Sequence, residues 1–278
     1  MMSFAYTNGI KISYEVSGSG FPVILIHGFG SKKEIWRPQV IDFSKKFKAI
    51  TFDLRGTGKT DRPNYPYTMG MFADDIKGLM DYLQIESTHL IGRSLGGMIA
   101  QNFVLKYPQY VKKLVLIATN AKFDDEATID LIIENRIKNI ELLKKDPDKA
   151  FWNNSRFLYH QKFRQELKRN PKKKFYGAFS LEDLIEESKI YPSRPQDIKN
   201  QGSAMKLHSA FNRLNEIKSE TLLIAASHDR LIPKSSMDEI HKRIPNSKFK
   251  VIENAGHFMT LSKAPEINKL ILDFLKSE

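Results

Sequence analysis

The stretch "HLIGRSLGGMIAQ" at residues 89–101 decides how the chain is organised. It begins as a short apolar run typical of a buried strand and continues with the spacing typical of a helix. Ser94 stands at the junction, with Gly92 and Gly96 two residues away on either side. A sharp strand-to-helix turn needs small flanking residues, and it projects the serine hydroxyl out of the sheet. The stretch therefore predicts such a turn with a nucleophilic hydroxyl at its tip.

Outward from this stretch, short apolar runs alternate with amphipathic segments. Asn8-Gly9 is typical of a tight hairpin turn and predicts paired strands over 4–7 and 10–17. Apolar runs of strand length lie at 22–26, 49–52, 88–92, 114–118, 221–226 and 249–252. Helical spacing lies between them, at 34–47, 71–83, 98–107, 235–243 and 264–277. This alternation predicts an α/β protein with a mostly parallel sheet flanked by helices on both faces.

The alternation breaks between residues 122 and 217, where the sequence has helical segments and no convincing strand. One segment carries a regular isoleucine face, formed by Ile129, Ile133, Ile137 and Ile140. A helical insertion between two strands of one sheet is the simplest organisation. We therefore expect a core domain formed by residues 1–121 and 218–278, and an inserted helical cap formed by 122–217.

Composition narrows the class of protein. The chain has 278 residues, of which 41% are hydrophobic and 27% charged, as is typical of a globular protein. The absence of cysteine excludes disulfides, thiolate catalysis and cysteine-zinc sites. The net charge of +12 favours anionic partners only weakly, because the basic residues are spread along the chain. The basic run at 162–174 contains one aromatic residue, so we expect a solvated cap face and no nucleic-acid site.

The start of the chain, "MMSFAYTNGIKISYEV", lacks the basic and apolar regions of a signal peptide. The longest apolar runs in the whole sequence are far shorter than the roughly 18 residues that span a bilayer. These features predict a cytoplasmic protein without a membrane span. A homodimer is among the oligomeric states that the sequence allows.

A serine hydroxyl becomes nucleophilic when a base removes its proton, and an acid must orient that base. Among the seven histidines, His257 follows the predicted strand 249–252 in a loop, whereas His241 falls inside a predicted helix. Asp229 occupies the matching loop after strand 221–226. We therefore predict a catalytic triad of Ser94, Asp229 and His257.

Three residues leave alternatives to this triad. Asp53 and Asn120 could replace Asp229 as the group that orients the histidine. Ser94 could be an ordinary helix N-cap, which is a common use of serine at this position.

Five motifs in this order resemble the α/β-hydrolase superfamily, in its capped esterase, lactonase and C–C hydrolase branch. They are "LIHGFG" (25–30), "FDLRGTGKT" (52–60), "GRSLGGMIAQ" (92–101), "DRLIP" (229–233) and "AGHF" (255–258). The resemblance covers nearly the whole chain and implies the α/β-hydrolase fold with an inserted helical cap. Within "FDLRGTGKT", Asp53 and Arg55 are expected to form an ion pair that stabilises the turn.

The same resemblance implies an oxyanion hole formed by the backbone N–H groups of Phe29 and Leu95. With Leu231 and Phe258, these residues are expected to wall an apolar substrate pocket. Arg93 departs from the small, apolar or histidine residue expected before the serine. Either it is buried and paired, or it meets an anionic group of the substrate.

Taken together, these features predict a serine carboxylesterase that needs no cofactor and no metal. Its expected partner is a small ester with a short-to-medium acyl chain, cleaved through an acyl-enzyme. The resemblance of "LGGMIAQ" to enol-lactonase sequences leaves a lactonase open, and a C–C hydrolase would use the same triad. A non-catalytic receptor for a small ligand is the alternative from another class, and the complete triad argues against it.

Overall fold

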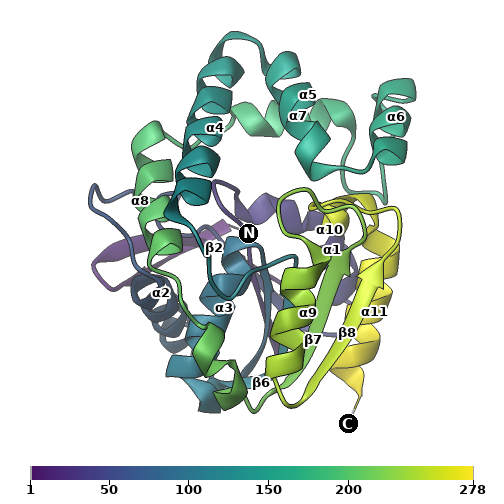
Figure 1. Ribbon diagram of the computed structural model, residues 1–278. Helices are drawn as coiled ribbons and strands as arrows, with labels where there is room; N and C mark the ends of the chain where they lie inside the picture. Colours follow the sequence, from purple (N-terminus) through teal and green to yellow (C-terminus); the bar gives the residue numbers. More distant parts are fainter. Residues whose placement is uncertain (1, 278) are drawn as a thin grey trace.

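The computed structural model describes residues 2–277, which form one eight-stranded sheet with helices on both faces (Figure 1). The strands are β1 (Met2–Thr7), β2 (Ile10–Ser17), β3 (Pro22–Ile26), β4 (Lys48–Phe52), β5 (Thr88–Arg93), β6 (Val111–Ile117), β7 (Glu220–Ala226) and β8 (Ser247–Ile252). Their order across the sheet is β1-β2-β4-β3-β5-β6-β7-β8. Only the β1–β2 and β2–β4 pairs are antiparallel, so the predicted mostly parallel sheet is confirmed.

Helices connect the strands and cover both faces of the sheet. They are α1 (Arg37–Phe43), α2 (Met69–Tyr82), α3 (Leu95–Lys106), α4 (Glu126–Lys145), α5 (Pro147–Leu158), α6 (Gln161–Arg169), α7 (Leu181–Lys189), α8 (Pro195–Lys206), α9 (Lys234–Arg243), α10 (Met259–Ser262) and α11 (Ala264–Lys276). Short 3₁₀ helices are η1 (Lys33–Trp36), η2 (Pro108–Tyr110) and η3 (Phe211–Glu216). Among residues 2–277, no helix is long and apolar enough to cross a membrane.

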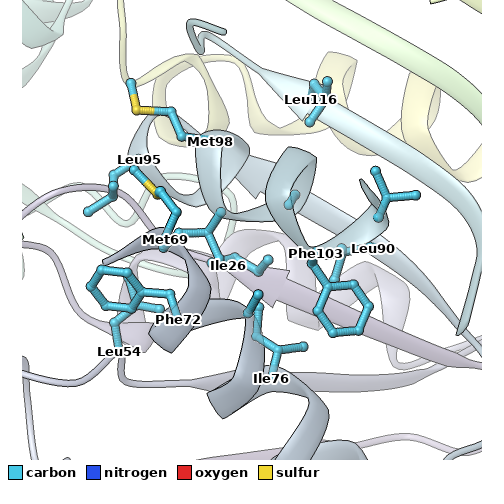
Figure 2. Packing of buried hydrophobic residues seen from close by; sticks show 14 of the residues in the cluster. Ile26, Leu54, Met69, Phe72, Ile76, Leu90, Leu95, Met98, Phe103 and Leu116 are labelled. Atoms are coloured by element: carbon cyan, nitrogen blue, oxygen red, sulfur yellow. The ribbon is translucent and has the colours of Figure 1, made fainter. Parts of the chain in front are cut away.

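The side chains of β3 point alternately to the two faces of the sheet, and this explains why the strand is apolar throughout. Ile24 and Ile26 pack in the core that α2, α3 and α9 cover, whereas Val23 and Leu25 pack against α1 and α11. Successive side chains of a strand point to opposite faces, so a strand covered on both faces must be continuously apolar. Figure 2 shows the first of these cores, with Ile26 beside Leu95, Met98 and Phe72.

One strand and one helix have bounds that differ from the predicted ones, and the structure shows the reason for each difference. The strand predicted at 114–118 begins earlier, at Val111, because the buried Lys113 is accommodated by ion pairing to Glu220 and by a hydrogen bond to the Phe274 carbonyl (2.9 Å). The helix predicted over 34–47 is divided into η1 and α1. Pro38 lies in the first turn of α1, where proline's missing N–H is tolerated.

The expected ion pair between Asp53 and Arg55 is wrong. Arg55 instead forms a two-pronged pair with Asp75 on α2, with both N–O distances 2.6 Å. Asp53 accepts hydrogen bonds from the backbone N–H groups of Lys33 (2.9 Å) and Lys59 (3.1 Å). The two charges are therefore satisfied by different parts of the chain, and both hold the loop after β4.

Helices α4–α8 all lie between residues 122 and 217, and Figure 1 shows α4 to α7 in a layer above the part that contains the sheet. This segment contacts loops at the carboxyl ends of the strands. The N–H of Phe258, after β8, donates to the carbonyl of Leu158 (2.9 Å). Gly30, after β3, receives a hydrogen bond from Arg136 on α4 (2.5 Å) and donates one to Gln201 on α8 (3.1 Å).

Candidate active site

Ser94 lies in a turn whose backbone is strained. Its φ of +55° and ψ of −122° are rare for a residue with a side chain. The turn is held by hydrogen bonds from the Ser94 N–H to Ile117 (2.9 Å) and from the Thr119 hydroxyl to the Ser94 carbonyl (2.7 Å). The side chain forms no capping hydrogen bond to α3, which argues against the N-cap alternative. The half-buried hydroxyl is therefore left available for chemistry.

The glycines around Ser94 allow the start of α3 to pack directly on neighbouring backbone. A Cβ atom on Gly96 would lie 2.1 Å from the Ile26 carbonyl oxygen at the end of β3. A Cβ atom on Gly92 would lie 2.3 Å from the Gly96 carbonyl oxygen. Both distances are far below van der Waals contact, so the turn requires glycine at these two positions.

Asp229 and His257 form a hydrogen-bonded pair at the ends of β7 and β8. His257 Nδ1 donates to Asp229 Oδ2 at 2.8 Å, and the two side chains are 4% and 1% exposed. The other oxygen of Asp229 accepts from the N–H groups of Leu231 (2.8 Å) and Ile232 (2.9 Å). With its carboxylate fixed in this way, Asp229 keeps a proton on Nδ1 and leaves Nε2 of His257 free to act as a base.

Ser94 and His257 line the same cavity, which has a volume of about 540 Å³. Within residues 2–277 no direct hydrogen bond joins the two side chains. Catalytic hydrogen bonds of this kind often tighten only when substrate is bound. Ser94 and His257 thus line the same space, and Asp229 is joined to this pair by its hydrogen bond to His257.

Within residues 2–277, neither of the alternative orienting residues, Asp53 and Asn120, forms a hydrogen bond or ion pair with His257. The carboxylate of Asp53 is bound by Lys33, which lies at 3.4 Å. The backbone carbonyl of Asn120 forms hydrogen bonds with Gln101 (2.9 Å) and with His208 Nε2 (3.2 Å). Asp229 is therefore the acidic residue that fits the geometry.

The backbone N–H groups of Phe29 and Leu95 have no hydrogen-bond acceptor among the described residues. Gly28 precedes Phe29, and a Cβ atom there would lie 3.2 Å from Ser94 Cβ, so this loop packs against the serine. Two unpaired N–H groups near a nucleophile are the arrangement that an oxyanion requires.

His27 holds the loop that carries Phe29 in place through hydrogen bonds of both ring nitrogens. Its Nδ1 donates to the Gly28 carbonyl (2.9 Å), and its Nε2 accepts from the N–H of Leu54 (3.1 Å). Burial lowers the pKa of His27 to about 4, which keeps the ring neutral and able to accept at Nε2. The bonding pattern indicates a supporting role.

Three of the four residues expected to wall the pocket line the cavity, namely Phe29, Leu231 and Phe258. The side chain of Leu95 does not: it is fully buried in the core beneath α3, so only its backbone can serve the site. The sequence did not indicate which residues of α4–α8 and their loops reach the cavity. The aromatic residues of this part of the chain that line the cavity are Phe123, Phe151, Phe157, Tyr159, Phe179 and Tyr191.

Arg93 is 1% exposed and has no carboxylate partner within residues 2–277, so the expected pairing is absent. Its guanidinium stacks on the ring of Phe258, 3.9 Å from the centroid. Burial lowers the pKa of Arg93 to about 10, which leaves the side chain charged at neutral pH. Its Nε and Nη1 atoms are buried without a hydrogen-bond partner.

Arg136 also lines the cavity, and sequence analysis missed it. It lies on α4 in the polar run "ENRIKN", a pattern typical of a solvated helix face. Its Nη2 donates to the Gly30 carbonyl, and its Nε is buried without a partner. No cluster of three histidine, aspartate or glutamate side chains suited to a metal ion occurs in the part of the chain that the structure describes.

Comparison with known proteins gives one family and several related enzymes. The model of the alpha/beta hydrolase fold family matches residues 22–264. The chain is 25% identical over 275 residues to "Putative carbamate hydrolase RutD" of Azorhizobium caulinodans, with 98% of each chain covered. A thermophilic esterase from Thermogutta terrifontis superposes with a TM-score of 0.83 at 24% identity, covering 99% of this chain and 98% of the other. A meta-cleavage product hydrolase from Pseudomonas fluorescens IP01 gives a TM-score of 0.76 at 26% identity, covering 98% and 97%.

Proposed function

This chain belongs to the α/β hydrolase fold family and is a hydrolase of that family, and on this premise we propose that it is a serine carboxylesterase. Its proposed substrates are carboxylic esters with short-to-medium acyl chains, cleaved through an acyl-enzyme. The observation that carries the proposal is the buried Asp229–His257 pair at the cavity onto which the strained turn of Ser94 opens.

In the proposed acylation step, the Ser94 hydroxyl attacks the ester carbonyl carbon and His257 Nε2 takes its proton. The carbonyl oxygen becomes an oxyanion, which the N–H groups of Phe29 and Leu95 stabilise. The tetrahedral intermediate then collapses, and His257 returns the proton to the departing alcohol. Asp229 holds the imidazole in the required tautomer and stabilises its positive charge.

In the proposed deacylation step, His257 removes a proton from water, and the resulting nucleophile attacks the acyl-enzyme. A second oxyanion forms in the same position and collapses to the free acid, while His257 returns the proton to the departing Ser94 oxygen. One base, one acid and one pair of N–H donors therefore serve both half-reactions. No group beyond these residues and water enters the atom balance.

We further propose that residues 122–217 act as a cap over a core formed by 1–121 and 218–278. Support comes from the cavity itself, because residues of α4, α5 and α7 line it together with loops of the sheet. The aromatic and aliphatic lining favours acyl chains that fill an enclosed space.

A C–C hydrolase is the second candidate, since the meta-cleavage product hydrolase shares 26% identity over almost the whole chain. A lactonase would use the same proposed residues. Screening purified protein against activated esters, lactones and vinylogous diketones separates these reactions. A lactone or diketone turned over about a hundredfold faster than every linear ester would replace the esterase assignment.

Labelling with a fluorophosphonate tests the nucleophile directly. We expect one modified residue per chain by mass spectrometry, with the label on Ser94 and none on the Ser94→Ala variant. Ser31→Ala is a matched control, because Ser31 also lines the cavity and should not affect labelling. Labelling that persists at full extent in Ser94→Ala would overturn the proposal.

A further inference from the structure

Two arginines that form no ion pair with a carboxylate among the described residues line the cavity and approach the loop that carries Phe29. Arg93 Nη2 lies 3.2 Å from the position that a Cβ atom on Gly28 would occupy. Arg136 Nε lies 2.8 Å from the corresponding position on Gly30. Both guanidinium groups therefore approach residues 28–30, and Ser94 Cβ also lies 3.2 Å from the Cβ position of Gly28.

The charges of these arginines are not balanced locally. Six lysine or arginine side chains line the cavity, against the two carboxylates of Glu34 and Glu187. Glu187 is engaged by Arg37 in a two-pronged contact (both 3.2 Å). Glu34 binds Lys33 through Oε1 (2.8 Å), and its Oε2 is buried without a hydrogen-bond partner. Asp229 attracts Arg93 but is already bound by His257 and two backbone N–H groups. Within residues 2–277, neither Arg93 nor Arg136 forms an ion pair with any of these carboxylates.

Burying an unpaired charge is costly, and a native structure normally supplies a partner for it. Arg93 has two buried nitrogens without an acceptor, and Arg136 has one. A guanidinium presents its N–H groups in a planar fork that fits a carboxylate. The missing acceptor thus has the chemistry of a carboxylate, and it would lie a few atoms from the reacting carbonyl.

We propose that Arg93 and Arg136 form a carboxylate-binding subsite, so that the preferred substrates are esters or lactones carrying a free carboxylate on the acyl side. This inference rests on the proposed function, which supplies the reaction at Ser94. The two arginines are specificity-determining residues, and the ester bond itself is cleaved by the residues named above. The hydrolysis product would be a dicarboxylic acid.

The first experiment compares monoethyl glutarate with its amide, ethyl 5-amino-5-oxopentanoate, which has nearly the same shape and no charge. Ethanol release gives kcat/KM for each ester. We expect the wild type to favour the carboxylate at least tenfold, because charge-assisted hydrogen bonds in a desolvated site are stronger than neutral ones. Arg93→Gln and Arg136→Gln should each reduce that preference to within about threefold of unity.

Arg156→Gln is the matched control. Arg156 also lines the cavity, but its guanidinium stacks on Phe157 (4.9 Å) and has no place in the proposed subsite. It should keep the wild-type preference. Equal losses in all three variants would show that general cavity charge sets the preference, and they would overturn the subsite.

A binding measurement separates this inference from the proposed function. Ser94→Ala keeps both arginines, and calorimetry should show it binding monoethyl glutarate at least tenfold more tightly than the amide. Equal affinities would overturn the inference, even if neutral esters are hydrolysed. A tenfold preference in binding, with no hydrolysis of any ester by the wild type, would support the subsite and reject the esterase proposal. This binding measurement on Ser94→Ala also tests the carboxylate-binding subsite if Arg93→Gln fails to fold.

Discussion

Asp229→Asn is the substitution that most directly probes the proposed mechanism. The new side chain is the same size, and its carbonyl oxygen can still accept from the N–H groups of Leu231 and Ile232, which lie at 2.8 and 2.9 Å. The amide NH₂ must then face His257 Nδ1, where Oδ2 stood at 2.8 Å. Two donors cannot share one hydrogen bond, so His257 must move its proton to Nε2.

A proton on Nε2 blocks acceptance of the Ser94 proton. The same tautomer change in serine proteases costs about 10⁴ in kcat, and we expect a loss of that size here. At 1.36 kcal/mol per factor of ten, this corresponds to about 5 kcal/mol in activation free energy. Stability should change little, because the backbone hydrogen bonds to residue 229 remain.

The assay is steady-state hydrolysis of p-nitrophenyl butanoate, with thermal unfolding measured on the same samples. Asp238→Asn is the charge control: Asp238 pairs with Lys242 on α9, away from the cavity, and its loss should leave kcat within about twofold. Asp229→Ala should lose both activity and stability, since it removes the backbone hydrogen bonds as well. If Asp229→Asn retains more than about a tenth of wild-type kcat, Asp229 is not the orienting acid.

Three further predictions follow from the same geometry. Gly96→Ala should lower the free energy of unfolding by more than about 2 kcal/mol, because a Cβ atom there would lie 2.1 Å from the Ile26 carbonyl oxygen. Gly70→Ala is the control, because a Cβ atom at this helical position would lie 3.6 Å from its nearest neighbour and should not destabilise the protein. Equal melting temperatures of the two variants would contradict this prediction. His27 has its pKa lowered from 6.5 to about 4, so the unfolded state binds the extra proton and the free energy of unfolding should fall as pH drops through that interval. His27 should account for a slope of up to about 1.4 kcal/mol per pH unit in urea titrations, beside similar contributions from His89 and His208, whose pKa values burial also lowers to about 4. His27→Gln should therefore show a shallower dependence, and an equally steep one would exclude this histidine as a source. Across p-nitrophenyl esters, kcat/KM should rise roughly fourfold per added CH₂ from acetate to about butanoate or hexanoate and then decline; a continued rise to palmitate would indicate an open groove.

Features that depend on local chain geometry could be predicted from the sequence. The turn at Ser94 needs glycine at fixed offsets, and the loops of Asp229 and His257 follow apolar strands whose carboxyl ends must share one edge of a parallel sheet. The run at 22–26 matches β3 residue for residue, because both of its faces are buried.

Features that depend on packing between distant segments could not be predicted. Arg136 occupies a polar stretch of α4 with no motif, and only the placement of α4 over Gly30 gives it a role. Leu95 was expected to wall the pocket, but the first turn of α3 directs its side chain into the core. Arg93 stood out by departing from the family pattern, yet the sequence did not reveal that Phe258, rather than a carboxylate, would cover its guanidinium.

Two hydrogen bonds fix the backbone of Gly30. Arg136 donates to its carbonyl oxygen, and its N–H donates to Gln201. Both side chains belong to helices of the proposed cap, α4 and α8, whereas Gly30 belongs to the loop that carries Phe29. If residues 122–217 are the cap that we propose, recombination could not exchange this cap freely among relatives. In a chimera with a cap from another protein, the loop that carries Phe29 would lose these two hydrogen bonds, unless the new cap supplied an equivalent donor and acceptor for Gly30. Transplants that carry matched partners for Gly30 should be recovered preferentially from a library of such chimeras.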